Sequence, residues 1–183
     1  MATPRFSVFI ATSVDGFIAR PDGDVDWLQE VGAEDLAQDD GGFADFFAAV
    51  DVLVMGRNTF EKVLSFDGPW PYGDKPVVVL SRTLAEVPDE LRETVSIEAC
   101  TPSELAHKLG ERGLRRVYLD GGQVIQSFLR EGLVSDLTVT RIAVLLGQGL
   151  PLFGELPGDI RLRLLDTRSW GECFEQSRYE VVN

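Results

Sequence analysis

Short apolar runs alternate with polar, turn-forming segments along most of the chain. Three of these runs, at 52–55, 76–80 and 117–119, lead into Gly56-Arg57, Ser81-Arg82 and, after one aspartate, Gly121-Gly122. Apolar runs of this length bounded by turn residues are typical of buried strands. The pattern therefore predicts three strands whose carboxyl ends carry glycine, serine or arginine. A phosphate-rich cofactor requires such residues at the edge of an open α/β sheet.

Helical signals lie between and before these strands. A stripe of apolar residues at i, i+3, i+4 and i+7 predicts an amphipathic helix: Phe43, Phe46, Phe47 and Val50. The segment 101–104 reads Thr-Pro-Ser-Glu, a capping box with proline at the first helical position, so we expect a helix to about Arg112. Shorter helices are expected over 58–64 and 123–130.

The remaining strand-like segments suggest how the sheet is completed. A β-rich run over 6–12 is broken by turn residues at 13–16, and another strand is expected near 95–98. The last third has strand-like runs over 137–144, 160–165 and 174–182, with no helix between them. Alternating strands and helices followed by a β-rich tail predict an α/β fold with a mostly parallel sheet closed by antiparallel strands. A chain of 183 residues is expected to form a single domain over 1–183.

Composition narrows the class of protein. Hydrophobic residues at 44% and charged residues at 26% are ordinary globular values, and the net charge of −13 argues against a nucleic-acid or anionic-membrane partner. The acidity equally fits a role in solubility alone. Cys100 and Cys173 lack metal-ligand spacing, so we expect reduced thiols and no metal site. Since no apolar run approaches a membrane span and no leader-like segment precedes the first strand, a soluble cytoplasmic protein is expected.

The strand ends carry the candidate phosphate chemistry. Gly56-Arg57-Asn58-Thr59 places backbone N–H groups and a guanidinium where a strand gives way to a helix, which is a favourable place for a phosphate. Ser81-Arg82 offers a hydroxyl and a second guanidinium at a similar strand end. Two arginines suit the 2′-phosphate of an adenosine ribose, which favours NADP over NAD. Taken singly, each site also fits a turn with an exposed arginine.

The double glycine offers a second kind of phosphate contact. Without side chains, Gly121 and Gly122 let the backbone approach a pyrophosphate at the start of the following helix. The spacing is not the dinucleotide fingerprint G-x-G-x-x-G, so a simple strand-to-helix turn is the alternative.

A proton donor is harder to assign. The one histidine, His107, falls inside the helix that follows the capping box and suits a surface position. Asp39 and Asp40 stand just before the phenylalanine-rich helix, where a carboxyl group would face the crevice near the end of the first strand. Either acid also fits the structural role of complementing the helix dipole.

With these strand ends in hand, the chain resembles the dihydrofolate reductase superfamily, and most of all the reductase domain of the riboflavin-biosynthesis deaminase–reductase. Five motifs carry the resemblance, in family order: Ala11-Thr-Ser-Val-Asp-Gly-Phe-Ile-Ala19, Met55-Gly-Arg-Asn-Thr-Phe60, Val79-Leu-Ser-Arg82, Leu119-Asp-Gly-Gly122 and Leu146-Gly-Gln-Gly-Leu-Pro-Leu-Phe153. The resemblance implies a three-layer fold with an eight-stranded sheet, helices on both faces, NADPH as hydride donor and a homodimer.

The resemblance also implies roles for single residues. Ala11 would contact the nicotinamide carboxamide through its backbone. The 2′-phosphate would be held by Arg57, Ser81 and Arg82 beside Gly56, and the pyrophosphate by Thr59, Gly121 and Gly122. Counting back from Gly56 without gaps, the active-site acid of folate reductases falls on Asp40, and their late-strand threonine matches Thr140.

Two departures from the family patterns are found, and the first argues against folate as the substrate. The arginine that clamps the glutamate tail of folate falls at Lys75, and lysine cannot pair bidentately with a carboxylate. The zinc motif of the bifunctional riboflavin enzymes is absent, so we expect a reductase module alone.

The resulting hypothesis is an NADPH-dependent reductase that delivers hydride to a C=N or C=O carbon of a small heterocyclic or ribosyl substrate. Asp40, or a water near Thr140, would complete protonation. A riboflavin precursor such as 5-amino-6-(5-phosphoribosylamino)uracil ranks slightly above a pterin, and an unassigned substrate above both. A non-catalytic NADPH-binding module and a dimerising structural protein with a vestigial crevice are the alternatives.

Overall fold

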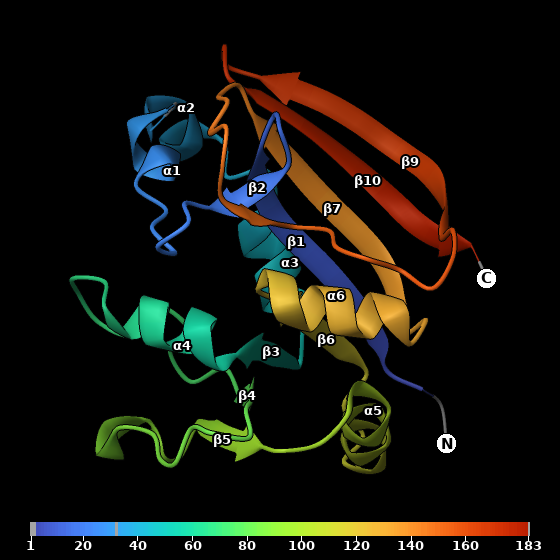
Figure 1. Cartoon of the computed structure of the whole chain (residues 1–183). Helices are drawn as coiled ribbons and strands as arrows, with labels where there is room; N and C mark the ends of the chain where they lie inside the picture. The colour runs from blue at the N-terminus through green and yellow to red at the C-terminus, as the bar shows by residue number, and fades with distance from the viewer. Residues whose placement is uncertain (1–2, 32, 183) are drawn as a thin grey trace.

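A computed structural model describes residues 3–31 and 33–182, and it is built around one eight-stranded sheet (Figure 1). The strands of the sheet are β1 Arg5–Ser13, β3 Val52–Gly56, β4 Val77–Leu80, β5 Val95–Glu98, β6 Arg116–Asp120, β7 Val134–Ile142, β9 Arg161–Trp170 and β10 Phe174–Val182. They lie in the order β5-β4-β3-β6-β1-β7-β10-β9. Two short strands, β2 Phe17–Ala19 and β8 Leu150–Pro151, pair antiparallel in a separate small sheet.

Neighbouring strands from β5 to β7 pair in parallel, and β10 is antiparallel to both β7 and β9. The sheet is therefore mostly parallel and is completed by antiparallel strands from the end of the chain, as predicted. The carboxyl ends of β1, β3, β4, β6 and β7 meet at one edge of the sheet, which is where ligands bind in open α/β folds.

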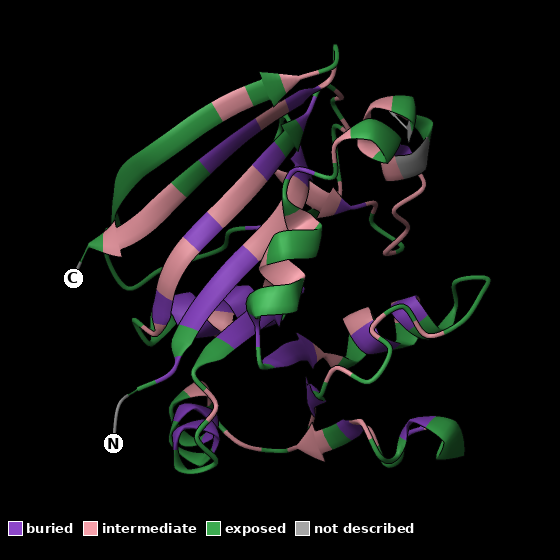
Figure 2. Cartoon of the chain, turned by 180° about the vertical axis from the view of Figure 1, so that it is seen from behind, coloured by how far each residue is buried: buried purple, intermediate pink, exposed green. Residues whose placement is uncertain are grey.

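Helices cover both faces of the sheet and make three layers. The helices are α1 Trp27–Glu30, α2 Ala33–Gln38, α3 Phe43–Ala49, α4 Arg57–Leu64, α5 Pro102–Glu111 and α6 Gly122–Arg130, with a 3₁₀ turn at Asp89–Leu91. In one core, residues of α5 and α6 pack against Val8, Val54 and Leu119 of the sheet. In the other, α3 and α4 pack against Leu53, Met55 and Tyr118, so α3 and α6 lie on opposite faces (Figures 1 and 2).

The predicted helices form for the reasons read from the sequence. The capping box at α5 is present: Glu104 N–H donates to Thr101 Oγ1, and Thr101 N–H donates to Glu104 Oε2. The phenylalanine stripe forms α3, whose Phe43 and Phe46 pack against Phe9 and Tyr118. The capping box was therefore sufficient to locate α5, and the apolar period was sufficient to locate α3.

Three features differ from the sequence prediction. The strand expected to reach Val144 ends at Ile142, because Val144 N–H turns back to bond the Ile142 carbonyl. The strand expected over 160–165 continues to Trp170 as β9, which lies at the open edge of the sheet and is exposed along most of its length (Figure 2). The short elements α1, α2, β2 and β8 were not predicted, since two to six residues are too few to show a period.

Candidate active site

Two helices begin side by side at the edge of the sheet where the carboxyl ends of the parallel strands meet. Helix α4 follows β3 and α6 follows β6, and these two strands pair in parallel. Glycines occupy both N-cap positions, Gly56 and Gly121, and within the described residues no side chain caps either helix. Their first-turn N–H groups therefore place two partial positive charges next to each other.

Close packing joins these two helix starts. Gly121 has φ +89°, and a Cβ atom there would lie 2.3 Å from Thr59 Oγ1. A Cβ on Gly122 would lie 3.1 Å from both Ile18 Cδ1 and the Pro151 carbonyl oxygen, so β2 and β8 pack closely over the start of α6. Glycine at both positions leaves the backbone N–H groups at the start of α6 uncovered by a side chain of their own, which is the arrangement that a backbone-bound phosphate requires.

The predicted 2′-phosphate residues also come together. Arg57 donates to Thr83 Oγ1 at 3.0 Å, which brings its guanidinium onto the turn after β4. Ser81 Oγ accepts from the N–H groups of Thr83 and Leu84 at 3.1 and 2.9 Å, so the hydroxyl proton stays available for a ligand. Arg82 is exposed on the same turn, near Glu104 at the start of α5. Thr83 was not singled out from the sequence, since only the folded turn places it against Arg57.

On the α3 side of the sheet, Ala11 of β1 lies opposite Thr140 of β7. Thr140 Oγ1 accepts a hydrogen bond from Gln176 Nε2 at 3.0 Å. Asp40 accepts from the N–H groups of Gly42 and Ala44, both at 2.8 Å. These bonds lower the pKa of Asp40, and the bond from Ala44 N–H has the largest effect. The carboxylate at the start of α3 is therefore ionised at neutral pH. By these two hydrogen bonds Asp40 has the role at the helix N-terminus that the sequence allowed as an alternative. A catalytic role for Asp40 stays a prediction.

A carboxyl group that sequence reasoning had not singled out lies at the centre of the edge. Asp120 ends β6, lies opposite Met55 of β3, and accepts from Gly121 N–H at 2.8 Å. Burial raises its pKa to about 6, and no cation of the described residues pairs with it. Perturbed carboxyl groups of this kind cluster at functional sites. The signal in the sequence is an acid directly before the double glycine at a strand end.

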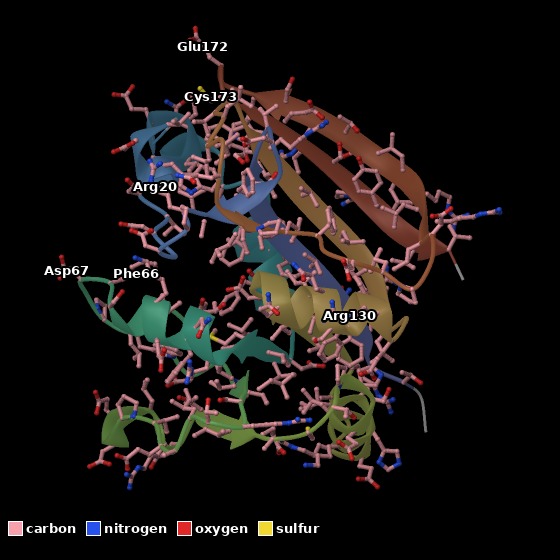
Figure 3. All side chains as sticks on the ribbon, viewed as in Figure 1. Arg20, Phe66, Asp67, Arg130, Glu172 and Cys173 are labelled. Carbon is pink, nitrogen blue, oxygen red and sulfur yellow. The ribbon has the colours of Figure 1, made fainter. Side chains whose placement is uncertain are left out.

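Acidic side chains of the loops after β1 and β2 hold the segment around β2 and β8 in place over the start of α6. Asp15 accepts from Ser13 Oγ at 2.6 Å and from the N–H groups of Leu146 and Gly147 at 3.2 and 2.7 Å, so the first and last of the five motifs are joined. Asp24 pairs with Lys62 Nζ of α4 at 3.1 Å. Figure 3 labels Arg20 on the loop after β2, and Phe66 and Asp67 on the loop that follows α4.

Lys75, at the position of the folate-clamping arginine, has a different role in this fold. Its Nζ donates to the Val50 carbonyl oxygen at 2.6 Å and lies 5.1 Å from the centre of the Phe47 ring. The lysine therefore holds the end of α3, and its ammonium group is committed to a neighbouring carbonyl.

Within residues 3–31 and 33–182, no helix is long and apolar enough to cross a membrane, and no three His, Cys, Asp or Glu residues are grouped to hold a metal ion.

Comparisons with known proteins identify relatives along the whole chain. Residues 4–174 match the model of the RibD C-terminal domain. The uncharacterized protein YwjB of Bacillus subtilis is 33% identical over 92% of this chain and 93% of its own length. A solved structure from Shewanella sp. PV-4, assigned to riboflavin biosynthesis, is 40% identical and superimposes with a TM-score of 0.91 over 98% of this chain and 99% of that one. RibD of Acinetobacter baumannii shares the fold at 19% identity and a TM-score of 0.73, with 99% of this chain covering 59% of RibD.

Proposed function

This chain belongs to the RibD C-terminal domain family of reductase-like domains, and from that premise we propose that it is an NADPH-dependent reductase. The proposed reaction is hydride transfer to a C=N or C=O carbon of a small heterocyclic or ribosyl substrate. The observation that carries the proposal is the meeting of two uncapped helix starts with the Arg57–Thr83 contact at one edge of the sheet. A nicotinamide dinucleotide with a 2′-phosphate fits that arrangement.

In this proposal the cofactor lies along the edge from β4 to β1. Arg57, Ser81 and Arg82 hold the 2′-phosphate beside Gly56, and Thr59 with Gly121 and Gly122 holds the pyrophosphate. The backbone of Ala11 orients the nicotinamide. NADPH, when bound, supplies the hydride, and the chain's own residues supply orientation and electrostatics.

We assign the proton to Asp120 rather than to Asp40. A general acid works best when its pKa is near the working pH, and burial brings the pKa of Asp120 to about 6. Asp40 is held as a carboxylate by α3, so it suits a hydrogen-bond acceptor for a substrate N–H group.

The proposed substrate is a pyrimidine that carries a ribose-derived chain. A Thermotoga maritima protein that shares this fold, at 15% identity and a TM-score of 0.73, is described as a deaminase and 5-amino-6-(5-phosphoribosylamino)uracil reductase, and this chain spans 57% of its length. A pterin ranks second, since the Lys75 ammonium group is committed to the Val50 carbonyl. The chain is also proposed to act in the cytoplasm as a homodimer that meets its second copy along β9.

The first experiment is a fluorescence titration of the purified protein with NADPH and with NADH. The wild type should prefer NADPH by about tenfold or more, because two charge-assisted phosphate contacts are lost with NADH. The double variant Arg57→Ala, Arg82→Ala should bind both cofactors at the NADH level. Equal binding of the two cofactors by the wild type would remove the 2′-phosphate site from the proposal.

Turnover separates the reductase from the non-catalytic alternative. Oxidation of NADPH with 5-amino-6-(5-phosphoribosylamino)uracil or 7,8-dihydrofolate supports the reductase. NADPH binding without turnover on either compound supports the binding module.

A further inference from the structure

A buried polar side chain fixes the hydroxyl group of Thr140. Gln176 of β10 is 3% exposed and lies opposite Thr140, which is 7% exposed. Gln176 Nε2 donates to Thr140 Oγ1 at 3.0 Å and to the Gly41 carbonyl oxygen at 3.1 Å. Both amide hydrogens of Gln176 are therefore used.

The contacts around Gln176 allow one orientation of its amide. Arg168 Nε donates to Gln176 Oε1 at 3.2 Å. If the amide were reversed, the Gln176 NH₂ group would lie against the Arg168 N–H, and the Gln176 oxygen would lie against the Gly41 carbonyl oxygen. Both contacts would then be repulsive, so Gln176 must donate to Thr140.

Arg168 is itself held from two other sides. Its NH1 and NH2 groups bond the two carboxylate oxygens of Asp39 at 3.2 and 3.3 Å, and its guanidinium lies 4.7 Å from the centre of the Trp170 ring. A planar guanidinium with three fixed contacts has little freedom to turn. This series of side-chain contacts, from Asp39 through Arg168 and Gln176 to Thr140, thus links the segment before α3 to β7.

The backbone at Gly41 is shaped to this network. Gly41 has φ +72°, and a Cβ atom there would lie 2.8 Å from Gln176 Nε2 and 3.3 Å from the Trp170 ring. The close approach of Gly41 to Gln176 is therefore possible for glycine alone. Asp39 also accepts from Gly41 N–H at 2.9 Å. Gly41 therefore contacts Asp39 through its N–H group and Gln176 through its carbonyl oxygen.

We infer that Gln176 is a positioning residue that makes Thr140 a hydrogen-bond donor to the substrate. The Thr140 oxygen already accepts from Gln176, and no described residue accepts its hydroxyl proton. That proton is therefore available to a molecule bound next to Ala11, the residue that pairs with Thr140 on β1. The inference rests on the proposed function and adds that the substrate must present an acceptor atom, a ring carbonyl oxygen or an unprotonated ring nitrogen, at this point.

The test compares Thr140→Val, Gln176→Leu and their double variant with the wild type. The pair Thr167→Val, Ser177→Ala is the matched control, because these hydroxyls bond each other at 3.1 Å between β9 and β10, with Ser177 adjacent to Gln176 and pointing to the other face. The probes are NADPH and 5-amino-6-(5-phosphoribosylamino)uracil, with 7,8-dihydrofolate as a second substrate probe.

We expect Thr140→Val and Gln176→Leu each to lower kcat/KM by about tenfold or more, with the Kd of NADPH within about twofold of the wild type. The double variant should be no worse than Thr140→Val alone, since Gln176 acts through the hydroxyl. Thr140→Ser should recover most of the activity, and the control pair should be unchanged. If Gln176→Leu does not fold, Arg168→Met at the partly exposed end of the network should lower kcat/KM in the same direction.

Two further outcomes separate this inference from the proposed function. Wild-type turnover that survives Thr140→Val unchanged, or losses that simply add in the double variant, overturns the inference and leaves the reductase in place. A wild type that binds NADPH but reduces neither probe overturns both. In the free protein, the side-chain amide hydrogens of Gln176 should exchange slowly with water by NMR, and rapid exchange would contradict the network itself.

Discussion

Asp120 combines an unfavourable environment with a central position. Its half-buried carboxyl group is desolvated by the packing at the end of β6, and one hydrogen bond from Gly121 N–H does not offset that cost to the charged form. The fold therefore carries a group that destabilises it when ionised. Such a cost is expected where a residue serves function at the expense of stability.

Replacing Asp120 by asparagine should stabilise the protein at neutral pH. Burial raises the pKa from 3.8 to about 6, so between these values the folded state binds more protons than the unfolded state, and stability falls as pH rises through this window. Asp120→Asn keeps the acceptor for Gly121 N–H and removes the charge. We expect a gain of about 1–3 kcal/mol in the free energy of unfolding at pH 8 and little gain at pH 4, measured by urea denaturation at both pH values.

The same variant should lose activity. The protonated fraction of Asp120 falls tenfold per pH unit above about 6, so wild-type kcat should fall in the same way if this group is the acid. Asp120→Asn should lower kcat by about a hundredfold and remove that pH dependence. A variant that is both less stable and equally active would contradict the assignment.

At the scale of elements, the site depends on how closely α4 and α6 start beside each other. Gly121→Ala would force a Cβ to within 2.3 Å of Thr59 Oγ1, in a backbone conformation with positive φ. We expect weaker NADPH binding by about tenfold or more, together with a loss of about 2 kcal/mol or more in stability. Gly113→Ala is the control, since Gly113 also has positive φ but its Cβ would meet open space. Equal NADPH binding by the two variants would show that the contact with Thr59 is unimportant.

The sequence predicted the elements that carry the proposed phosphate-binding residues, because strand length, helix period and caps are local properties. The segment Gly56-Arg57 lies where a strand gives way to a helix, as expected, and Ser81 directly follows a strand. The Gln176 network could not be predicted in the same way. Asp39 and Arg168 are 129 residues apart, and their pairing depends on β9 and β10 returning to the segment before α3.

At the scale of the whole molecule, β9 is the least covered part of the sheet. Its exposed side chains include Leu162, Leu164 and Leu165, which are 43%, 56% and 48% exposed. A groove of about 770 Å³ between α3 and β9 adds further uncovered surface, with Leu165 on its wall. Arg163 and Arg168 of β9 are paired with Glu180 and Asp39 of the same chain, so the strand presents leucines with much of its charge already neutralised. Two chains of net charge −13 repel each other overall, and a contact through these leucines adds no close pair of like charges to that repulsion.

Leu164→Arg should therefore convert the proposed dimer to monomers. In a two-fold interface the substitution occurs twice, and each copy both loses the burial of a leucine, worth about 1.5–3 kcal/mol, and gains a desolvated charge. Light scattering should give about twice the 20.2 kDa chain mass for the wild type and a single chain mass for the variant. Leu145→Arg is the control, since Leu145 is 71% exposed but lies outside β9, and it should remain dimeric. A wild type that is monomeric at high micromolar concentration would remove β9 as a dimer contact. The proposed cofactor site would be unaffected, because its residues lie within one chain.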